Sequence, residues 1–157
     1  MDFTLRDIRP EDKDALQRFH VGLSDETRYR RFHAYKGELT NSDLRYLTEI
    51  DGRSHVAVVA EHDGELVAVA RAVIDAERGG EAELAVVVGD EQQSSGIGAV
   101  LVDRLRRRMA ARGVERLVAE VQADNHRALR FFQGFGARQR AGEGTVRELV
   151  IDTSRDA

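Results

Sequence analysis

The sequence predicts an α/β fold built around a mixed β-sheet. Stretches with the alternating pattern of strands and stretches with helical periodicity follow one another along the chain. Residues 84–88 are continuously apolar, as expected for a central strand that is covered on both faces. A loop with two glycines comes next and leads directly into an amphipathic segment, residues 98–112. These patterns favour helices packed in layers on a sheet.

The composition predicts one globular domain, residues 1–157. Apolar residues make up 41% of the chain and charged residues 33%, which suits a domain with a substantial core. The net charge of −4 does not favour binding to nucleic acid or to an anionic membrane. No apolar run approaches the roughly 18 residues of a membrane span, and no signal region opens the chain, so a cytoplasmic protein is expected. The absence of cysteine excludes disulfides and a thiolate nucleophile, and no metal site is expected because the histidines lack metal-ligand spacing.

The first part of the chain predicts one short strand and three helices. The strand covers residues 3–8. Pro10 suits a helix start, because its fixed φ fits the first helical turn. A second helix is predicted over residues 26–32. A third begins at Thr40, because Thr40 and Asp43 have the spacing of a capping box.

The remainder of the chain is richer in strands. Residues 56–60 and 66–70 form a predicted hairpin, which is joined by Asp63-Gly64, a dipeptide that favours a tight turn. Residues 84–88 supply the next strand. Beyond them we expect a helix over residues 98–112, a strand over 117–121 and a helix over 125–133. Two short strands follow, and the second covers residues 146–151.

The loop Gln93-Ser94-Ser95-Gly96-Ile97-Gly98 is the strongest candidate for a binding site. A helix start leaves backbone N–H groups without partners, and its dipole favours anions. The glycines let the backbone approach a ligand closely. A dinucleotide-binding fingerprint would need a third glycine where Leu101 stands, and the lysine of a P-loop is absent. On its own chemistry the loop is an anion site or simply a tight turn.

The pattern Gln93-x-x-Gly96-x-Gly98, between an apolar strand and an amphipathic helix, resembles the signature motif of the GNAT family of N-acetyltransferases. The order of elements along the chain also resembles that family, including Asn125 at the start of the helix after the fifth strand. The resemblance implies a GNAT fold, which is a mixed, mostly antiparallel sheet of six to seven strands. Helices would lie on both faces, and the sheet would be splayed between its fourth and fifth strands.

The resemblance also implies acetyl-CoA as co-substrate. The loop amides would hold the pyrophosphate, the exposed strand backbone at Val86 and Val88 would pair with the pantetheine arm, and Asn125 would bond the arm from the far side. The cofactor-binding residues implied in this way are Val86, Val87, Val88, Gln93, Ser94, Ser95, Gly96, Ile97, Gly98, Ala99, Asn125 and Phe132.

Three segments resemble the bacterial Pat-type protein lysine acetyltransferases more narrowly, namely residues 82–86, 24–32 and 112–121. In that group the glutamate at the position of Glu83 is taken as the general base. A lysine ammonium must lose a proton before it attacks a thioester, and a carboxylate in a partly dry cleft can accept that proton, directly or through water. Glu81 and His55 are the alternative bases, and a solvated charge at a strand end is the alternative explanation of Glu83.

Phe132 departs from the family pattern. Many GNAT proteins carry a tyrosine at this position, where it can protonate the leaving thiolate, and phenylalanine has no hydroxyl. Either water or backbone groups assist the thiolate, or the domain is not catalytic. Pat-type proteins often lack this tyrosine as well, so the departure bears on the general acid more than on the subgroup.

The predicted function is acetyl-CoA-dependent N-acetylation of a protein lysine by direct attack of the amine, and an acyl-CoA synthetase is a candidate acceptor. No covalent enzyme intermediate is expected, because cysteine is absent. The alternatives are acetylation of a small amine or amino acid, and a non-catalytic domain that binds coenzyme A or another ligand. Both a monomer and a homodimer remain open.

A run of arginines on the predicted helix over residues 98–112 is expected on the exposed face of that helix. The simplest interpretation is a solvated face, and the alternative is attraction of the 3′-phosphate of coenzyme A or of an acidic partner. The run consists of Arg104, Arg106, Arg107, Arg108 and Arg112.

Overall fold

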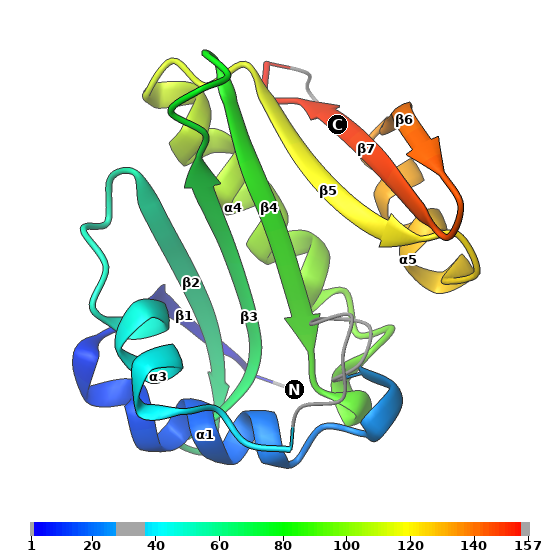
Figure 1. Cartoon of the computed structure of the whole chain (residues 1–157). Helices are drawn as coiled ribbons and strands as arrows, with labels where there is room; N and C mark the ends of the chain where they lie inside the picture. The colour runs from blue at the N-terminus through cyan, green and yellow to red at the C-terminus, as the bar shows by residue number, and fades with distance from the viewer. Residues whose placement is uncertain (1, 28–36, 155–157) are drawn as a thin grey trace.

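A computed structural model describes residues 2–27 and 37–154 of the chain. Within these residues the strands form one seven-stranded sheet in the order β1-β2-β3-β4-β5-β7-β6 (Figure 1). Neighbouring strands are antiparallel except for β4 and β5, which are parallel. The mixed, mostly antiparallel sheet predicted from the sequence is thereby confirmed. The strands are β1 Thr4–Asp7, β2 His55–His62, β3 Glu65–Ile74, β4 Glu81–Val88, β5 Arg116–Gln122, β6 Arg138–Glu143 and β7 Val146–Asp152.

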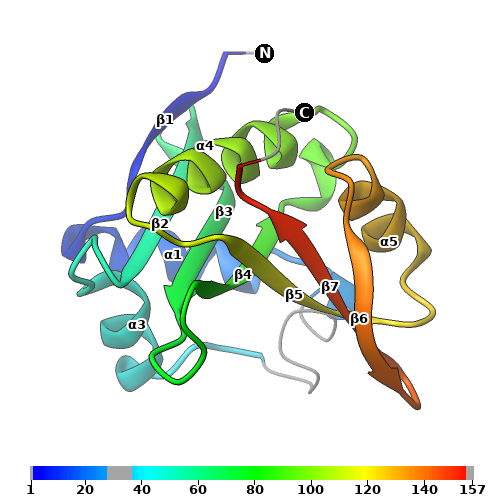
Figure 2. The same ribbon diagram turned by 90° about the horizontal axis from the view of Figure 1, so that it is seen from above.

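Helices cover both faces of the sheet, as the sequence predicted (Figure 2). Helices α1 and α3 lie on one face, and α4 and α5 lie on the other. Most of the predicted second helix falls outside the described residues, although Asp25, Glu26 and Thr27 at its start are helical. The helices are α1 Lys13–Val21, α3 Asn41–Thr48, α4 Ile97–Ala111 and α5 His126–Gln133, with 3₁₀ turns η1 Pro10–Asp12 and η2 Asp90–Gln92. None of the described helices has the length and apolar character needed to cross a membrane.

The packing of strand β2 explains why residues 56–60 are all apolar. Val56 and Val58 pack with the helices of one face, whereas Ala57 and Val59 pack with those of the other. Side chains alternate between the two faces of a strand, so a strand covered on both sides needs an apolar residue at every position. The two layers of helices therefore enclose two separate cores, one on each side of the sheet.

Local signals place the ends of several elements where the sequence predicted them. The hydroxyl of Thr40 accepts a hydrogen bond from the Asp43 amide at 3.0 Å, and the Asp43 carboxylate accepts one from the Thr40 amide at 2.8 Å. This reciprocal pair is the predicted capping box. Asp63 and Gly64 have φ values of 52° and 79°, and two positive φ values in succession make the tight turn of a two-residue hairpin.

The parallel pair of β4 and β5 is short, and this opens the sheet. The strands pair only from Glu81 opposite Arg116 to Glu83 opposite Val118. Beyond that point β4 stays bonded to β3, and β5 stays bonded to β7. In Figure 1 the two strands lie side by side at the top and diverge downward. The predicted splay between the fourth and fifth strands is confirmed, and it leaves residues 84–88 unpaired on the side that faces β5.

The predicted exposed arginine run on α4 is wrong for one member. Arg106 is buried, and its guanidinium donates to the carbonyl oxygen of Thr153 at 3.0 Å and to Asp103 at 2.7 Å. A long arginine side chain can bury its stem while its charged end finds acceptors. Arg106 thus fastens α4 to the segment that follows β7 instead of facing solvent.

Candidate functional site

A cleft of about 810 Å³ lies in the opening between β4 and β5. Its walls come from these two strands, from α5 and from the loop that precedes α4. Every predicted site residue lines it except Ser95 and Ile97. Ile97 is buried in the core, and its amide donates to the hydroxyl of the exposed Ser95 at 3.3 Å, so these two residues are hydrogen-bonded to each other within the loop.

The loop at the start of α4 presents unused backbone donors to the cleft. Within the described chain, the amides of Gly98 and Ala99 have no acceptor, and the first helical bond runs from Val100 to Gly96 at 3.3 Å. Ser94 and Gly96 have φ values of 75° and 89°. A left-handed φ at a non-glycine residue costs about 1–3 kcal/mol and is found mostly at functional sites. Free amides in such a turn form an anion-binding concavity, so the residues present fit a phosphate.

The unpaired edge of β4 forms the second wall. Val86, Val87 and Val88 are each partly exposed in the cleft, although they belong to a strand in the middle of the sheet. Because no strand occupies this side of β4, its backbone N–H and C=O groups can pair with an extended ligand, as a sheet edge does with an added strand. The pantetheine arm of coenzyme A has amide groups suited to that pairing.

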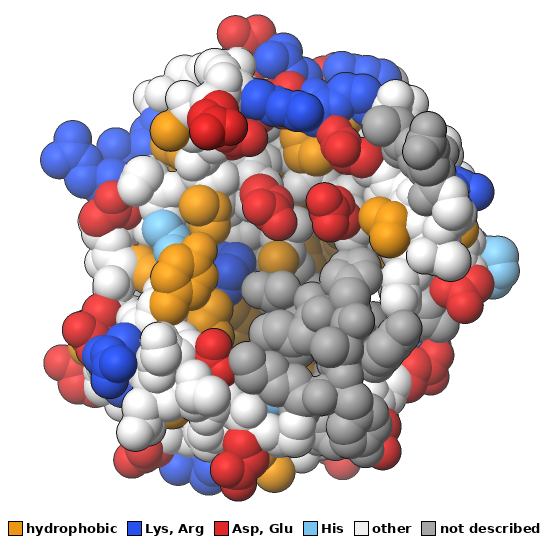
Figure 3. Space-filling view, viewed as in Figure 1, with side chains coloured by type: hydrophobic (Ala, Val, Ile, Leu, Met, Phe, Trp, Pro, Cys, Tyr) orange, Lys and Arg blue, Asp and Glu red, His pale blue; other side chains and the backbone are white. Residues whose placement is uncertain are grey.

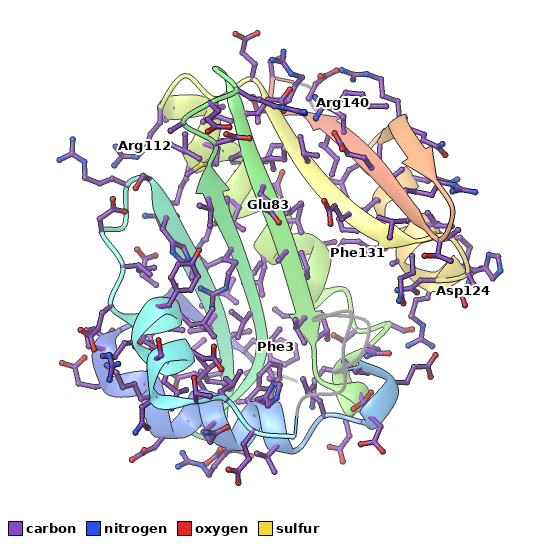
Figure 4. The ribbon with its side chains drawn as sticks, in the orientation of Figure 1. Phe3, Glu83, Arg112, Asp124, Phe131 and Arg140 are labelled. Carbon is purple, nitrogen blue, oxygen red and sulfur yellow. The ribbon has the colours of Figure 1, made fainter. Side chains whose placement is uncertain are left out.

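Glu83 stands at the fork, on the last residue of β4 that pairs with β5 (Figure 4). Its side chain is exposed and lines the cleft, and its carboxylate makes no ion pair or hydrogen bond with any residue that the structure describes. Glu120 on β5 lines the opposite wall and is also exposed. Figure 3 shows acidic side chains over β4 and β5 on this face of the molecule. A free carboxylate at this position can accept a proton from a bound amine.

The two alternative bases lie outside the cleft lining. Glu81 is buried and accepts hydrogen bonds from Arg140 and Arg116. The bond from Arg140 lowers the pKa of Glu81, although burial opposes this, and a paired carboxylate of low pKa is a weak base. Burial, followed by the charge of Arg71, lowers the pKa of His55 to about 4, and the ring lies on β2, two strands away from the cleft edge.

Asn125 and Phe132 lie on the far wall, at the two ends of α5. The Asn125 side-chain oxygen caps the helix by accepting from the Ala128 amide at 3.2 Å, which leaves its NH₂ group to face the cleft as a donor. Phe132 is buried and packs edge-on against Phe131, with ring centroids 5.1 Å apart. No hydroxyl is present at this position to protonate a leaving group.

The structure adds cleft residues that sequence reasoning missed. Asp90 accepts hydrogen bonds from the Ser24 amide at 2.8 Å and the Thr27 hydroxyl at 2.8 Å, so the segment that resembles Pat-type proteins is fastened to the loop after β4. Arg127 on α5 donates to the side chain of Gln93. The position of Arg127 two residues after Asn125, in the first helical turn, could have indicated a cleft residue, but the longer arginine run of the preceding helix drew the prediction instead.

Among the described residues, no cluster of three or more histidine, aspartate or glutamate side chains could hold a metal ion.

Known proteins resemble this chain in sequence and fold. A family model described as "Acetyltransferase (GNAT) family" matches residues 15–137. The chain is 34% identical over 137 residues to Acetyltransferase Pat of Mycolicibacterium smegmatis, covering 86% of this chain and 41% of that protein. It is 34% identical over 130 residues to Acetyltransferase PA5475 of Pseudomonas aeruginosa, covering 80% and 69%. The crystal structure of the GNAT domain of S. lividans PAT superposes with a TM-score of 0.88 at 29% identity, over 94% of this chain and 89% of that one. The chain therefore spans about two fifths of the length of the first of these curated relatives.

Proposed function

The chain belongs to the GNAT family of acetyltransferases, and we propose that it transfers an acetyl group from acetyl-CoA to the side-chain amine of a protein lysine. One observation carries this proposal. The splay of the sheet puts three features along a single cleft, namely the free amides that begin α4, the unpaired edge of β4 and the exposed carboxylate of Glu83. Together they match an extended ligand with a phosphate at one end and a reacting carbonyl at the other.

Each part of the cleft has its own task in this proposal. The amides of Gly98 and Ala99 bind the pyrophosphate, and the edge of β4 at Val86 and Val88 aligns the arm. Bound acetyl-CoA supplies an acyl group already activated as a thioester. Backbone N–H groups of the open strand polarise the carbonyl, and fixed donors of this kind are effective because they need no reorganisation.

Glu83 is the proposed general base. An amine must be neutral before it attacks a carbonyl, and Glu83 faces the cleft without a competing partner among the described residues. The proton passes to Glu83 directly or through a water molecule. The amine then attacks the thioester directly, and the absence of cysteine, the most nucleophilic side chain for an acyl-enzyme, supports this order. With phenylalanine at position 132, water or a backbone group assists the departing thiolate.

The protein acceptor is supported by two resemblances. Pat is among the relatives, and residues 24–32 and 82–86 resemble segments of Pat-type enzymes. The structure fastens the start of the first segment to the cleft through Asp90. We propose that this side of the cleft receives the lysine, with an acyl-CoA synthetase as the first protein to test.

The test measures release of free coenzyme A from acetyl-CoA by the purified chain. The acceptors are an acyl-CoA synthetase, free lysine and a polyamine. Glu83→Gln is expected to lower kcat by about 100-fold or more, in the range of general base catalysis, without changing the calorimetric affinity for acetyl-CoA. Glu77→Gln is the matched control, because Glu77 is exposed and lies outside the cleft lining.

Each contrary result identifies the part of the proposal that fails. Full activity of Glu83→Gln at pH 8 excludes Glu83 as base. Turnover with the polyamine or free lysine alone replaces the protein acceptor with a small amine. Binding of acetyl-CoA without turnover on any acceptor makes the chain a ligand-binding module, and the absence of binding removes the proposal altogether.

A further inference from the structure

Helix α5 packs directly against the start of α4, and this contact determines where Arg127 lies. A Cβ atom on Gly98 would come within 3.3 Å of the Phe131 ring, so the two helices are in close contact at these residues. Arg127 precedes Phe131 by four positions and therefore lies on the same face of α5, one turn earlier. Its side chain lines the cleft beside the loop that precedes α4.

A relay of hydrogen bonds holds the Arg127 side chain in this place. Arg127 donates from Nη1 to the side-chain oxygen of Gln93, and Gln93 donates in turn to the carbonyl oxygen of Val88 at 3.1 Å. This relay links α5 to the end of β4 at the wide end of the splay. Gln93 is neutral, and no carboxylate of the described residues pairs with Arg127. No ion pair with a described residue offsets the positive charge of Arg127, and its other N–H groups are available to a ligand.

The other charged side chains of the cleft suggest what Arg127 binds. Among the described residues that line the cleft, the charged side chains other than Arg127 are all acidic, and they are Glu26, Glu83, Asp90 and Glu120. These acidic side chains repel a pyrophosphate, and of the described side chains that line the cleft only Arg127 carries the charge that offsets this repulsion. The planar guanidinium can also donate two parallel bonds to phosphate oxygens, which a lone amide cannot do.

We propose that Arg127 is the cationic ligand of the pyrophosphate of coenzyme A. It completes the amide site at Gly98 and Ala99, and its bond to Gln93 positions it before the ligand arrives. This inference rests on the proposed binding of acetyl-CoA and assigns a phosphate contact to a side chain outside the signature loop. Arg127 acts on binding, so the proton transfer at Glu83 does not depend on it.

The test compares Arg127→Gln with Arg130→Gln by calorimetry. Both substitutions remove one positive charge from α5, but Arg130 is exposed and does not line the cleft. The titrants are coenzyme A and dephospho-coenzyme A, which retains the pyrophosphate and lacks the 3′-phosphate. We expect Arg127→Gln to weaken both by about 10- to 100-fold, the range of a hydrogen bond to a charged group, and Arg130→Gln to weaken neither.

A second measurement separates a phosphate contact from a loss of structure. The value of kcat/KM for acetyl-pantetheine, which has no phosphate, is expected to be the same in Arg127→Gln and wild type. An equal fall for acetyl-pantetheine and acetyl-CoA would mean that Arg127 only positions α5, and would overturn the inference. Weakening confined to coenzyme A, with dephospho-coenzyme A unaffected, would move the contact to the 3′-phosphate and overturn the pyrophosphate assignment.

The wild-type titration distinguishes the two proposals. If the wild-type chain does not bind coenzyme A, the proposed function fails before any variant is compared. If it binds, and Arg127→Gln binds equally well, only the role of Arg127 fails.

Discussion

Arg140 on β6 donates hydrogen bonds to Glu81 on β4, across the two strands that lie between them in the sheet. The same guanidinium donates from Nε to Glu148 on β7 at 2.7 Å, and Arg116 on β5 donates to Glu81 at 3.2 Å. Every strand on the C-terminal side of the splay is thereby tied to β4 at the narrow end. This network fixes the point from which the cleft opens.

Replacing Glu81 is expected to destabilise the fold rather than abolish the chemistry. Glu81→Gln removes the charge that three strands share, and we expect the free energy of unfolding at pH 7 to fall by about 1–3 kcal/mol. Hydrogen bonding from Arg140 lowers the pKa of Glu81, so its stabilisation is complete above the ordinary glutamate pKa of about 4.3 and is lost as the pH falls below it. Urea unfolding at pH 7 and pH 3.5 measures both effects. Equal losses of stability on acidification in the variant and in wild type would contradict this role.

His55 is expected to give the protein a second, separate dependence on pH. Burial and the nearby charge of Arg71 lower the pKa of His55 from 6.5 to about 4, despite the opposing charge of Asp51. Between these values the unfolded chain binds a proton that the folded chain does not, so stability falls as the pH drops from 6.5 towards 4. His55→Gln is expected to make the melting temperature less dependent on pH between pH 6.5 and pH 4. Glu81→Gln is the control, because it lowers stability evenly across that window and changes the pH dependence only below about pH 4.3.

Gly98 is expected to tolerate no side chain without a loss of ligand affinity. A Cβ atom there would lie 3.1 Å from Val88 and 3.3 Å from Phe131, so both walls of the cleft would have to move by a few tenths of an ångström. Alanine also favours a helix by about 0.5–1 kcal/mol over glycine, which offsets the crowding, so Tm is expected to change little. We expect calorimetry to show several-fold weaker acetyl-CoA binding by Gly98→Ala, since small misplacements in such sites are costly.

Gly79→Ala is the matched control for that variant. A Cβ atom on Gly79 meets nothing within 4 Å, and its φ is not in the left-handed region. Unchanged acetyl-CoA affinity in Gly98→Ala would show that Val88 and Phe131 can move apart without affecting the site.

Asp90 is expected to affect the acceptor more than acetyl-CoA. Asp90→Ala removes the acceptor of the Ser24 amide and the Thr27 hydroxyl, so the segment on the proposed acceptor side loses its tie to the loop. We expect KM for the protein acceptor to rise by about tenfold, the equivalent of one good hydrogen bond, with KM for acetyl-CoA nearly constant. Glu91→Ala, at an exposed neighbouring position, is the comparison. A rise in KM for acetyl-CoA alone would place Asp90 on the cofactor side.

Local signals made much of the fold predictable. The capping box of Thr40 and Asp43, the turn at Asp63 and Gly64 and the alternating or continuous apolar runs depend on residues close together in sequence. The splay was predicted from family resemblance, since pairing between distant strands leaves little trace in either strand alone. The loop at the start of α4 was a candidate anion site from its own chemistry, and the resemblance made coenzyme A its expected ligand.

Contacts between distant residues were not predictable in this way. Glu81 and Glu83 lie on the same face of β4 two residues apart, and the sequence of the strand does not indicate which of them forms an ion pair. Glu81 is the paired one because of Arg140, which is 59 positions away in sequence. Arg106 looked exposed because its partner, the carbonyl of Thr153, lies 47 residues away. Arg127 was overlooked for the same reason, because its neighbour Gln93 belongs to another element.

A sheet normally has unpaired backbone only along its two outermost strands. Because β4 and β5 separate beyond Glu83 and Val118, this sheet carries two additional edges in its interior. Unpaired edges are templates on which other chains can add strands and aggregate. A ligand that lies along β4 covers that template, and it also stabilises the folded chain by an amount that rises with the logarithm of its concentration. On the proposed function, the supply of acetyl-CoA would therefore govern how long the protein survives in a crowded cell, in addition to how fast it works.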